Sequence, residues 1–231
     1  MASKINIGCL MWYNTGISNY ADINYKINKV YCDKWGYDLL KSDVRAYNDG
    51  RTLHWEKLPM ILANLGSYDY VVWIDADAHF YIDSPGLDVV ISVFPDSGII
   101  ISGDLNQRNP WELNSGFMII KNNEASRKII EAWAYNDSYK RLSKFPYWEQ
   151  SILWYMYSQN LDGVRAALTV IPYGQLQHFY DKELVKFALN KYTGTKKPFV
   201  HHSPGTHPPE RFNSSNSYYL GVVKPTLEKN L

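Results

Sequence analysis

The sequence is poor in cysteine, in net charge and in long apolar runs. Two cysteines among 231 residues, Cys9 and Cys32, are too few for the disulfide framework of a small extracellular domain, and we expect both to be buried free thiols. The 24 basic and 23 acidic side chains leave a formal charge of +1, which argues against nucleic acid as a partner. No run of about 18 apolar residues is present, so no membrane segment is predicted.

The first residues also lack the long apolar stretch of a secretory signal, so we expect a cytoplasmic protein or a domain cut from a longer chain. Three common catalytic motifs are missing as well: Gly-x-Gly-x-x-Gly, the Walker Gly-Lys-Ser/Thr and Gly-x-Ser-x-Gly. Their absence removes the usual evidence for a dinucleotide enzyme, a P-loop enzyme or a serine hydrolase. The sequence has instead 45% apolar residues, enough to bury a substantial core.

Apolar periodicity predicts strands that alternate with helices. Residues 4–10 alternate with period two, which is typical of a strand, and residues 21–35 repeat apolar side chains at helical spacing up to Gly36. Further strands are predicted at 37–40, 70–74, 99–102, 117–120 and 170–171, and further helices at 53–65, 124–133 and 148–159. Residues 213–219 are polar, and we expect them to be irregular. The alternation predicts an α/β fold with a mostly parallel central sheet flanked by helices.

Two aspartates follow the most apolar of these predicted strands, residues 70–74. Asp75 and Asp77 lie on either side of Ala76, at the strand end where open α/β sheets bind ligands. Carboxylate oxygens suit hard divalent cations such as Mg²⁺ and Mn²⁺, and a cation held there would stabilise charge on a phosphate leaving group. Asp is also common in solvated turns and helix caps, which is the alternative interpretation.

Two adjacent histidines offer a third metal ligand. His201 and His202 follow a short predicted strand, residues 199–200, and precede the turn-forming pair Pro204-Gly205. Imidazole is a common metal ligand. The alternative is a pair of surface histidines in a proline-rich loop, and the pattern leaves open which of the two would bind a metal.

Two short polar segments complete the set of candidate site residues. Asn114, Ser115 and Gly116 precede a predicted strand, where small polar residues would let a sugar approach the backbone. A plain turn is the alternative there. Glu149 and Gln150 lie at a predicted helix start, where a first-turn Glu also serves as a partner of the helix dipole.

Taken in order, these segments resemble a family of glycosyltransferases. The family includes fungal Golgi α-galactosyl- and α-mannosyltransferases, plant xyloglucan xylosyltransferases and the small glycosyltransferases of large algal DNA viruses. The resemblance rests on NKVYC and GYD within residues 28–38, WEKLP at 55–59, WIDADA at 73–78, LNSGF at 113–117, WEQS at 148–151 and HSPG at 202–205. WIDADA is similar to the family's metal motif almost letter for letter, whereas the family usually has Asp where this chain has Glu149.

The resemblance implies a Rossmann-like GT-A fold in a single domain over residues 1–231. About residues 1–100 would form the nucleotide-binding half, and about residues 101–231 the half that completes the acceptor and metal sites. The implied activity is a metal-dependent transfer of a sugar from a nucleotide diphosphate donor, most often a UDP-sugar, to a hydroxyl of a glycan or glycoprotein. Retention at the anomeric carbon is the outcome that the family favours.

The resemblance also implies roles for single residues. Asp75, Asp77 and His202 would bind Mn²⁺ or Mg²⁺, and Gln150 with Glu149 would lie near the anomeric carbon. The donor would contact Gly8, Cys9, Met11, Tyr13, Lys57, Ala76, Asn114, Ser115 and Gly116. If the reaction inverted instead, a carboxylate would have to accept the hydroxyl proton, and Glu149 and Asp104 are the candidates.

Two alternative functions stay open at this point. A metal-dependent phosphoryl-transfer enzyme or hydrolase would use the same carboxylates and release free phosphate. A non-catalytic carbohydrate-binding module would bind glycans without a metal. Such a module would use the abundant aromatic residues, which make up 15% of the chain.

The aromatic residues divide into two predicted groups. Tyr31, Trp35, Trp73 and Phe117 fall on apolar faces and are expected to pack in the core. Those in predicted loops or helix starts are expected to stack on a nucleobase or a sugar face: Trp12, Tyr13, Trp111, Tyr147 and Trp148.

Overall fold

The computed structural model describes residues 4–105, 107–140, 145–179, 190–194, 197–205 and 208–229. Within them the chain forms a central sheet of six strands in the order β2-β1-β3-β6-β5-β7. The strands are β1 (Ile7–Trp12), β2 (Asp38–Ser42), β3 (Tyr70–Ile74), β5 (Ile99–Gly103), β6 (Leu113–Lys121) and β7 (Leu168–Ile171). Only β6 runs antiparallel to its neighbours, so the predicted mostly parallel sheet is confirmed.

A second, smaller sheet lies beside the first. It has three strands in the order β4-β9-β8: β4 (Ala78–Phe80), β8 (Gln177–His178) and β9 (Val200–His202). Strand β4 follows β3 after only three residues, Asp75, Ala76 and Asp77. These three residues, the acidic segment, therefore connect the large sheet to the small one.

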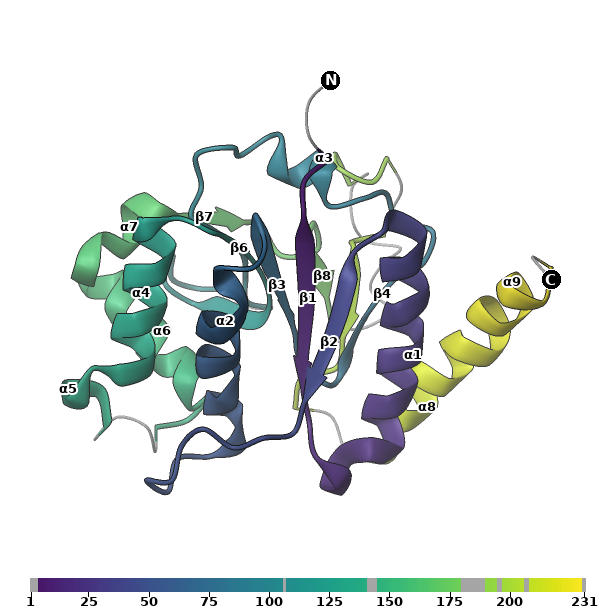
Figure 1. The fold of residues 1–231 in the computed structure, drawn as a ribbon, viewed down its shortest axis with the longest axis horizontal. Helices are drawn as coiled ribbons and strands as arrows, with labels where there is room; N and C mark the ends of the chain where they lie inside the picture. The colour runs from purple at the N-terminus through teal and green to yellow at the C-terminus, as the bar shows by residue number, and fades with distance from the viewer. Residues whose placement is uncertain are drawn as a thin grey trace.

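Helices cover both faces of the large sheet. Helix α1 (Ser18–Trp35) and the small sheet lie on one side, and α2 (Lys57–Leu65), α4 (Glu124–Tyr135) and α6 (Glu149–Gln159) lie on the other (Figure 1). Strand β3 is buried throughout because successive side chains point to opposite faces of the sheet, and each face has its own apolar cluster. Val71 packs in the cluster that includes Leu58 of α2, and Val72 packs in the cluster that includes Tyr31 of α1.

The predicted helix at 53–65 forms in two parts. A 3₁₀ turn, η2 (Leu53–Glu56), leads directly into α2. Pro59 falls in the first turn of α2, where a missing N–H costs no helical hydrogen bond. At the end of α1, Gly36 has a φ of +68°, a left-handed conformation that favours glycine, which confirms the predicted stop.

The remaining helical elements are short, apart from one near the C-terminus. They are η1 (Thr15–Ile17), α3 (Asp88–Ile91), α5 (Asp137–Lys140), η3 (Leu161–Gly163), α7 (Val164–Ala167), α8 (Pro208–Tyr218), the π-helix η5 (Tyr219–Val223) and α9 (Lys224–Lys229).

The prediction that residues 213–219 are irregular is wrong, because α8 covers most of that segment. Its sequence is polar, yet α8 packs along α1 (Figure 1). Ser215 is buried, and Val223 just beyond α8 joins Ile27 of α1 and Ile82 in an apolar cluster. Tertiary contact with α1 therefore stabilises a helix that its own composition does not predict.

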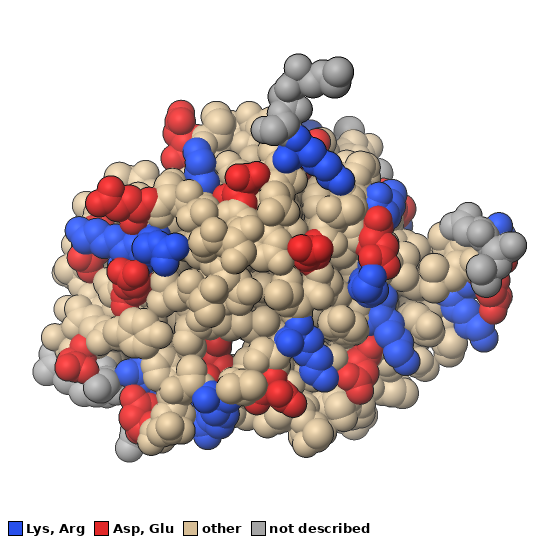
Figure 2. Space-filling model, viewed as in Figure 1, with Lys and Arg blue, Asp and Glu red and all other residues tan. Residues whose placement is uncertain are grey.

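Charged side chains of both signs are interspersed over the face seen in Figure 2. No described helix combines the length and the apolar character that a membrane crossing requires.

Candidate active site

A cavity of about 1130 Å³ opens along one edge of the large sheet. Its walls include Trp12 at the end of β1, Asp75 after β3, Asp104 after β5 and Asn114 at the start of antiparallel β6. All four positions lie at the edge formed by the carboxyl ends of the parallel strands, where α/β sheets bind ligands. A cavity of this size is large enough for a substrate of several rings.

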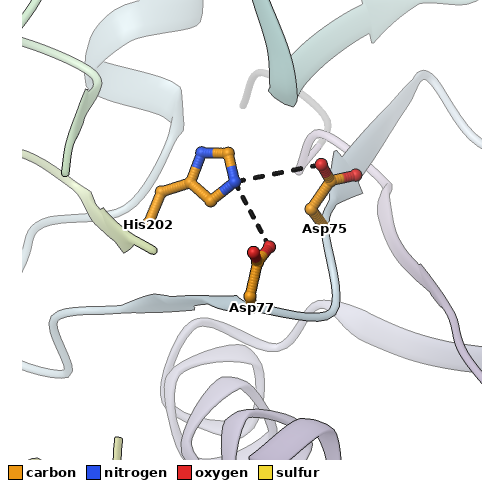
Figure 3. Close-up of side chains that lie close together, drawn as sticks. All are labelled: Asp75, Asp77 and His202. Carbon is orange, nitrogen blue, oxygen red and sulfur yellow. Dashed lines mark ion pairs between the residues drawn. The ribbon is translucent and has the colours of Figure 1, made fainter. Parts of the chain in front are cut away.

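Asp75, Asp77 and His202 meet in this cavity (Figure 3). Their candidate ligand atoms all lie within 4.8 Å of one another. His202 Nε2 is 3.3 Å from Asp77 Oδ1 and 3.9 Å from Asp75 Oδ2. The topology produces this approach, because antiparallel pairing of β4 with β9 sets Ala78 opposite His202. Two carboxylates and one imidazole form a donor set that fits a divalent cation.

Strand geometry also separates the two histidines. Both belong to β9 rather than to a loop, so their side chains point to opposite faces. His202 faces the aspartates, whereas His201 Nε2 lies 3.1 Å from both Ser203 Oγ and Ser214 Oγ. The pair of surface histidines considered above is therefore wrong, since both side chains are buried.

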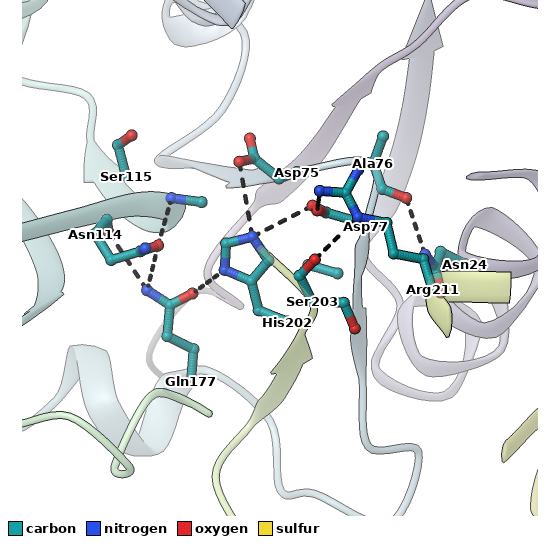
Figure 4. A network of polar contacts seen from close by, with 12 residues as sticks. Asn24, Asp75, Ala76, Asp77, Asn114, Ser115, Gln177, His202, Ser203 and Arg211 are labelled. Carbon is teal, nitrogen blue, oxygen red and sulfur yellow. Dashed lines mark hydrogen bonds and ion pairs between the residues drawn. The ribbon is translucent and has the colours of Figure 1, made fainter. Parts of the chain in front are cut away.

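Neighbouring residues orient the His202 ring (Figure 4). Gln177 Nε2 donates to the Oδ1 and the backbone oxygen of Asn114, which turns Gln177 Oε1 toward His202 Nδ1 at 3.0 Å. Nδ1 then carries the proton, and Nε2 is left to face the two aspartates. Gly116 makes room for the ring, because a Cβ there would lie 2.1 Å from His202 Cε1.

The backbone of the acidic segment is held at each of its three residues. Asp75 N–H donates to Gly116 O at 2.8 Å, and Asn24 Nδ2 of α1 donates to Ala76 O at 2.9 Å. Ser203 N–H donates to Asp77 O at 3.0 Å. The segment is thus tied to the large sheet, to α1 and to the end of β9.

Lys57 joins the metal-ligand candidates to the start of α6. Its buried Nζ lies 3.2 Å from Asp75 Oδ1 and 2.7 Å from Glu149 Oε1. It also lies 3.3 Å from Ser115 O and 3.2 Å from Ser115 Oγ. Burial by itself lowers the pKa of Lys57, but the two carboxylates outweigh burial and raise that pKa above its ordinary value. Lys57 is therefore a charged lysine inside the protein.

Gln150 and Asp104 form the adjoining part of the wall. Ser115 donates its N–H and its hydroxyl to Gln150 Oε1, at 2.9 and 3.2 Å. The amide Nε2 of Gln150 is 3.5 Å from Asp104 Oδ2. Burial raises the pKa of the Asp104 carboxyl, although a hydrogen bond from Leu105 N–H opposes the shift.

Arg211 also reaches this site, and the sequence offered no signal for it. The guanidinium comes from α8 and lies 3.2 Å from Asp77 Oδ2 (Figure 4). It also donates to Ser203 O and to Tyr20 Oη, both at 3.1 Å. Like Gln177, Arg211 is an isolated polar residue outside any motif, so only the fold reveals it.

Comparison with known proteins agrees with this architecture. No protein-family model matches the chain. Over 130 residues it is 27% identical to xyloglucan 6-xylosyltransferase 4 of Arabidopsis thaliana, a match that covers 51% of this chain and 24% of the plant protein. The chain thus spans about a quarter of that relative's length.

Solved structures resemble the chain over nearly its whole length. A glycosyltransferase involved in glycosylation of the major capsid of PBCV-1 aligns with a TM-score of 0.69 and 16% identity, over 91% of this chain and 98% of that one. The galactosyltransferase LgtC, in complex with donor and acceptor sugar analogues, aligns with a TM-score of 0.56 and 14% identity, over 90% and 94%. The chain has the GT-A glycosyltransferase fold.

Within this GT-A fold, the cavity includes only some of the predicted donor residues. Lys57, Ala76, Asn114 and Ser115 line it. The lining does not include four residues of β1 and its end, Gly8, Cys9, Met11 and Tyr13, which the sheet and its helices cover. Trp12, Asn14 and Ile17 line the cavity in their place.

Gly116 also differs from its predicted role. It and its neighbours are the first residues of β6 rather than a turn before the strand, and Gly116 lies under the His202 ring instead of lining the cavity.

Two exposed aromatic residues lie at the rim of the cavity. Tyr147 and Trp148 line the rim and are 56% and 40% exposed. Both have positive φ, 67° and 47°, a strained conformation for large side chains. Trp148 stacks on His54 with 3.7 Å between ring centroids. Trp111 does not line the cavity.

Proposed function

We propose that this chain is a metal-dependent glycosyltransferase. It would move a sugar from a nucleotide diphosphate donor, with a UDP-sugar as first choice, to a hydroxyl of a glycan or glycoprotein. The observation that carries the proposal is the meeting of Asp75, Asp77 and His202 in the large cavity of a GT-A fold. A glycan-binding module has no need for such a cluster at a strand end.

Asp75, Asp77 and His202 would hold Mn²⁺ or Mg²⁺, which would stabilise the diphosphate as it leaves. The surrounding residues support that role, because Gln177 orients the His202 ring and Gly116 leaves space for it.

Different residues of the cavity lining suit different parts of the substrates. Residues from β1 and the start of α1 line it, including Trp12 and Tyr20. In α/β folds the first strand-to-helix connection commonly binds the nucleotide, so we assign the nucleoside to these residues and to the half within about residues 1–100. Tyr147, Trp148 and Gln150 also line the cavity, and we assign the acceptor to them and to the later half of the chain.

The chemistry at the anomeric carbon would depend on Gln150 and Asp104. Ser115 holds the side chain of Gln150 in place, and this supports a fixed amide next to the donor sugar in a retaining reaction. In an inverting reaction, Asp104 suits the role of general base better than Glu149. Its raised pKa makes the Asp104 carboxylate a stronger base than an ordinary aspartate, whereas Glu149 is buried and paired with Lys57.

A panel of nucleotide sugars with Mn²⁺ and glycan acceptors tests the proposal. We expect glycoside formation that EDTA abolishes. Free phosphate as the main product would favour a phosphoryl-transfer enzyme or hydrolase. Glycan binding that survives both EDTA and Asp75→Asn, without turnover of any donor, would favour a carbohydrate-binding module.

A further inference from the structure

Each aspartate of the acidic segment divides its two oxygens between different partners. Asp75 Oδ2 and Asp77 Oδ1 are the oxygens nearer to His202 Nε2. The opposite oxygens lie beside cations: Asp75 Oδ1 is 3.2 Å from Lys57 Nζ, and Asp77 Oδ2 is 3.2 Å from Arg211. Each carboxylate therefore joins the metal-ligand cluster to one positively charged side chain. Figure 4 shows the Asp77–Arg211 pair.

The two cations differ in how far the protein encloses them. The Lys57 side chain is 4% exposed, and its Nζ has four oxygens within 3.3 Å, more than its three N–H groups. The Arg211 side chain is 20% exposed. Both side chains line the cavity and both have partners within the protein, but the more exposed Arg211 offers a substrate more surface to contact than Lys57 does.

The charges around the site also differ with and without Arg211. Asp75, Asp77 and Glu149 carry three negative charges, and Lys57 balances one of them. A divalent cation would cancel the remaining two and leave the cluster neutral. Arg211 then adds a positive charge beside this cluster, which would attract an anionic diphosphate.

We propose that Arg211 binds the donor's diphosphate next to the metal site. The inference rests on the proposed function, since it assumes a diphosphate donor. Asp77 positions the guanidinium through Oδ2 while its Oδ1 faces the metal side, so an anion held at the metal lies within reach of Arg211. The planar guanidinium is suited to phosphate oxygens because it can donate two parallel hydrogen bonds.

Calorimetry with two probes tests this role on the full chain: Mn²⁺ alone, and the complex of Mn²⁺ with inorganic pyrophosphate. In Arg211→Met we expect pyrophosphate affinity to fall by about tenfold to a hundredfold, the loss typical of a charge-assisted hydrogen bond. Affinity for Mn²⁺ alone should stay equal or rise, because a positive charge beside the site is removed. A merely structural defect would weaken both.

Two further variants sharpen the result. Arg211→Lys keeps the positive charge but loses the planar guanidinium that donates two parallel hydrogen bonds. Its pyrophosphate affinity should therefore lie between those of the wild type and Arg211→Met. Arg108→Met removes an exposed arginine that lines the same cavity, and its pyrophosphate affinity should change less than about twofold.

Two outcomes would overturn the inference, and they are distinguishable. If the wild-type chain binds Mn²⁺–pyrophosphate and Arg211→Met binds it equally well, Arg211 has no such role while the proposed function stands. If the wild-type chain binds neither probe, the metal site and the proposed function are refuted together with the inference about Arg211.

Discussion

Asp75 and Asp77 are two residues apart, yet different parts of the molecule hold them. Asp75 directly follows β3 of the large sheet, and its side chain accepts from Trp73 Nε1 at 2.6 Å and pairs with Lys57. Asp77 directly precedes β4 of the small sheet and pairs with Arg211 of α8. The comparison teaches that one carboxylate depends on the central sheet and its helices, whereas the other depends on the C-terminal part of the chain.

The largest effect on stability is expected from Lys57→Met, which removes the cation paired with Asp75. The change leaves Glu149 buried without its cation, and breaking a buried pair in this way costs about 3–5 kcal/mol of stability. Urea denaturation measures the loss. Lys128→Met is the matched control: its ion pair with Asp162 is exposed, so a change below about 1 kcal/mol is expected. Equal losses in both variants would contradict the buried role of Lys57.

Asp75→Asn and Asp77→Asn should have the same effect on metal binding but different effects on stability. Each removes a metal-ligand candidate, so each should lower Mn²⁺ affinity and sugar transfer by about a hundredfold. Asp75→Asn should also lower the free energy of unfolding by about 1–3 kcal/mol, because Lys57 is buried beside it.

Asp77→Asn should keep nearly wild-type stability, since its cation Arg211 is partly exposed. Calorimetry with Mn²⁺ and urea denaturation provide the two readouts. Unchanged Mn²⁺ affinity in Asp77→Asn would refute the metal site.

Gly116→Ala tests whether His202 is a metal ligand. The new Cβ would overlap the His202 ring and displace it, so we expect Mn²⁺ affinity to fall by about tenfold to a hundredfold. Gly221→Ala is the control, because nothing lies within 4 Å of a Cβ at that position. Normal Mn²⁺ binding by Gly116→Ala would mean that His202 is not a ligand.

The smallest effect is expected from Gln177→Leu, which removes a residue of β8 that links His202 to Asn114 of β6. Loss of Gln177 Oε1 removes the acceptor for His202 Nδ1–H, and such outer partners typically contribute about tenfold in metal affinity. Titration with Mn²⁺ measures the change. Gln177→Glu keeps an acceptor for His202 Nδ1–H but loses the amide that donates to Asn114, so its Mn²⁺ affinity should lie between those of the wild type and Gln177→Leu. An affinity no higher than that of Gln177→Leu would argue against the hydrogen bond to His202.

Several elements could be predicted because local patterns determine them. The run of residues 70–74 is apolar on both faces, as a strand between two helical layers must be, and β3 is that strand. The antiparallel direction of β6 could not be predicted, since its apolar residues are as continuous as those of a parallel strand. Helix α8 could not be predicted either, because its stability comes from contact with α1.

The sequence by itself determined the alternation of strands and helices and the position of the acidic segment at a strand end. Those features follow from apolar periodicity and from the order of residues along one strand. Only the tertiary structure decided that His202 and not His201 meets the aspartates. Pairing of β9 with β4 sets which face of the strand each imidazole occupies. It also decided that Arg211 reaches Asp77, because that contact depends on packing between segments far apart in the chain.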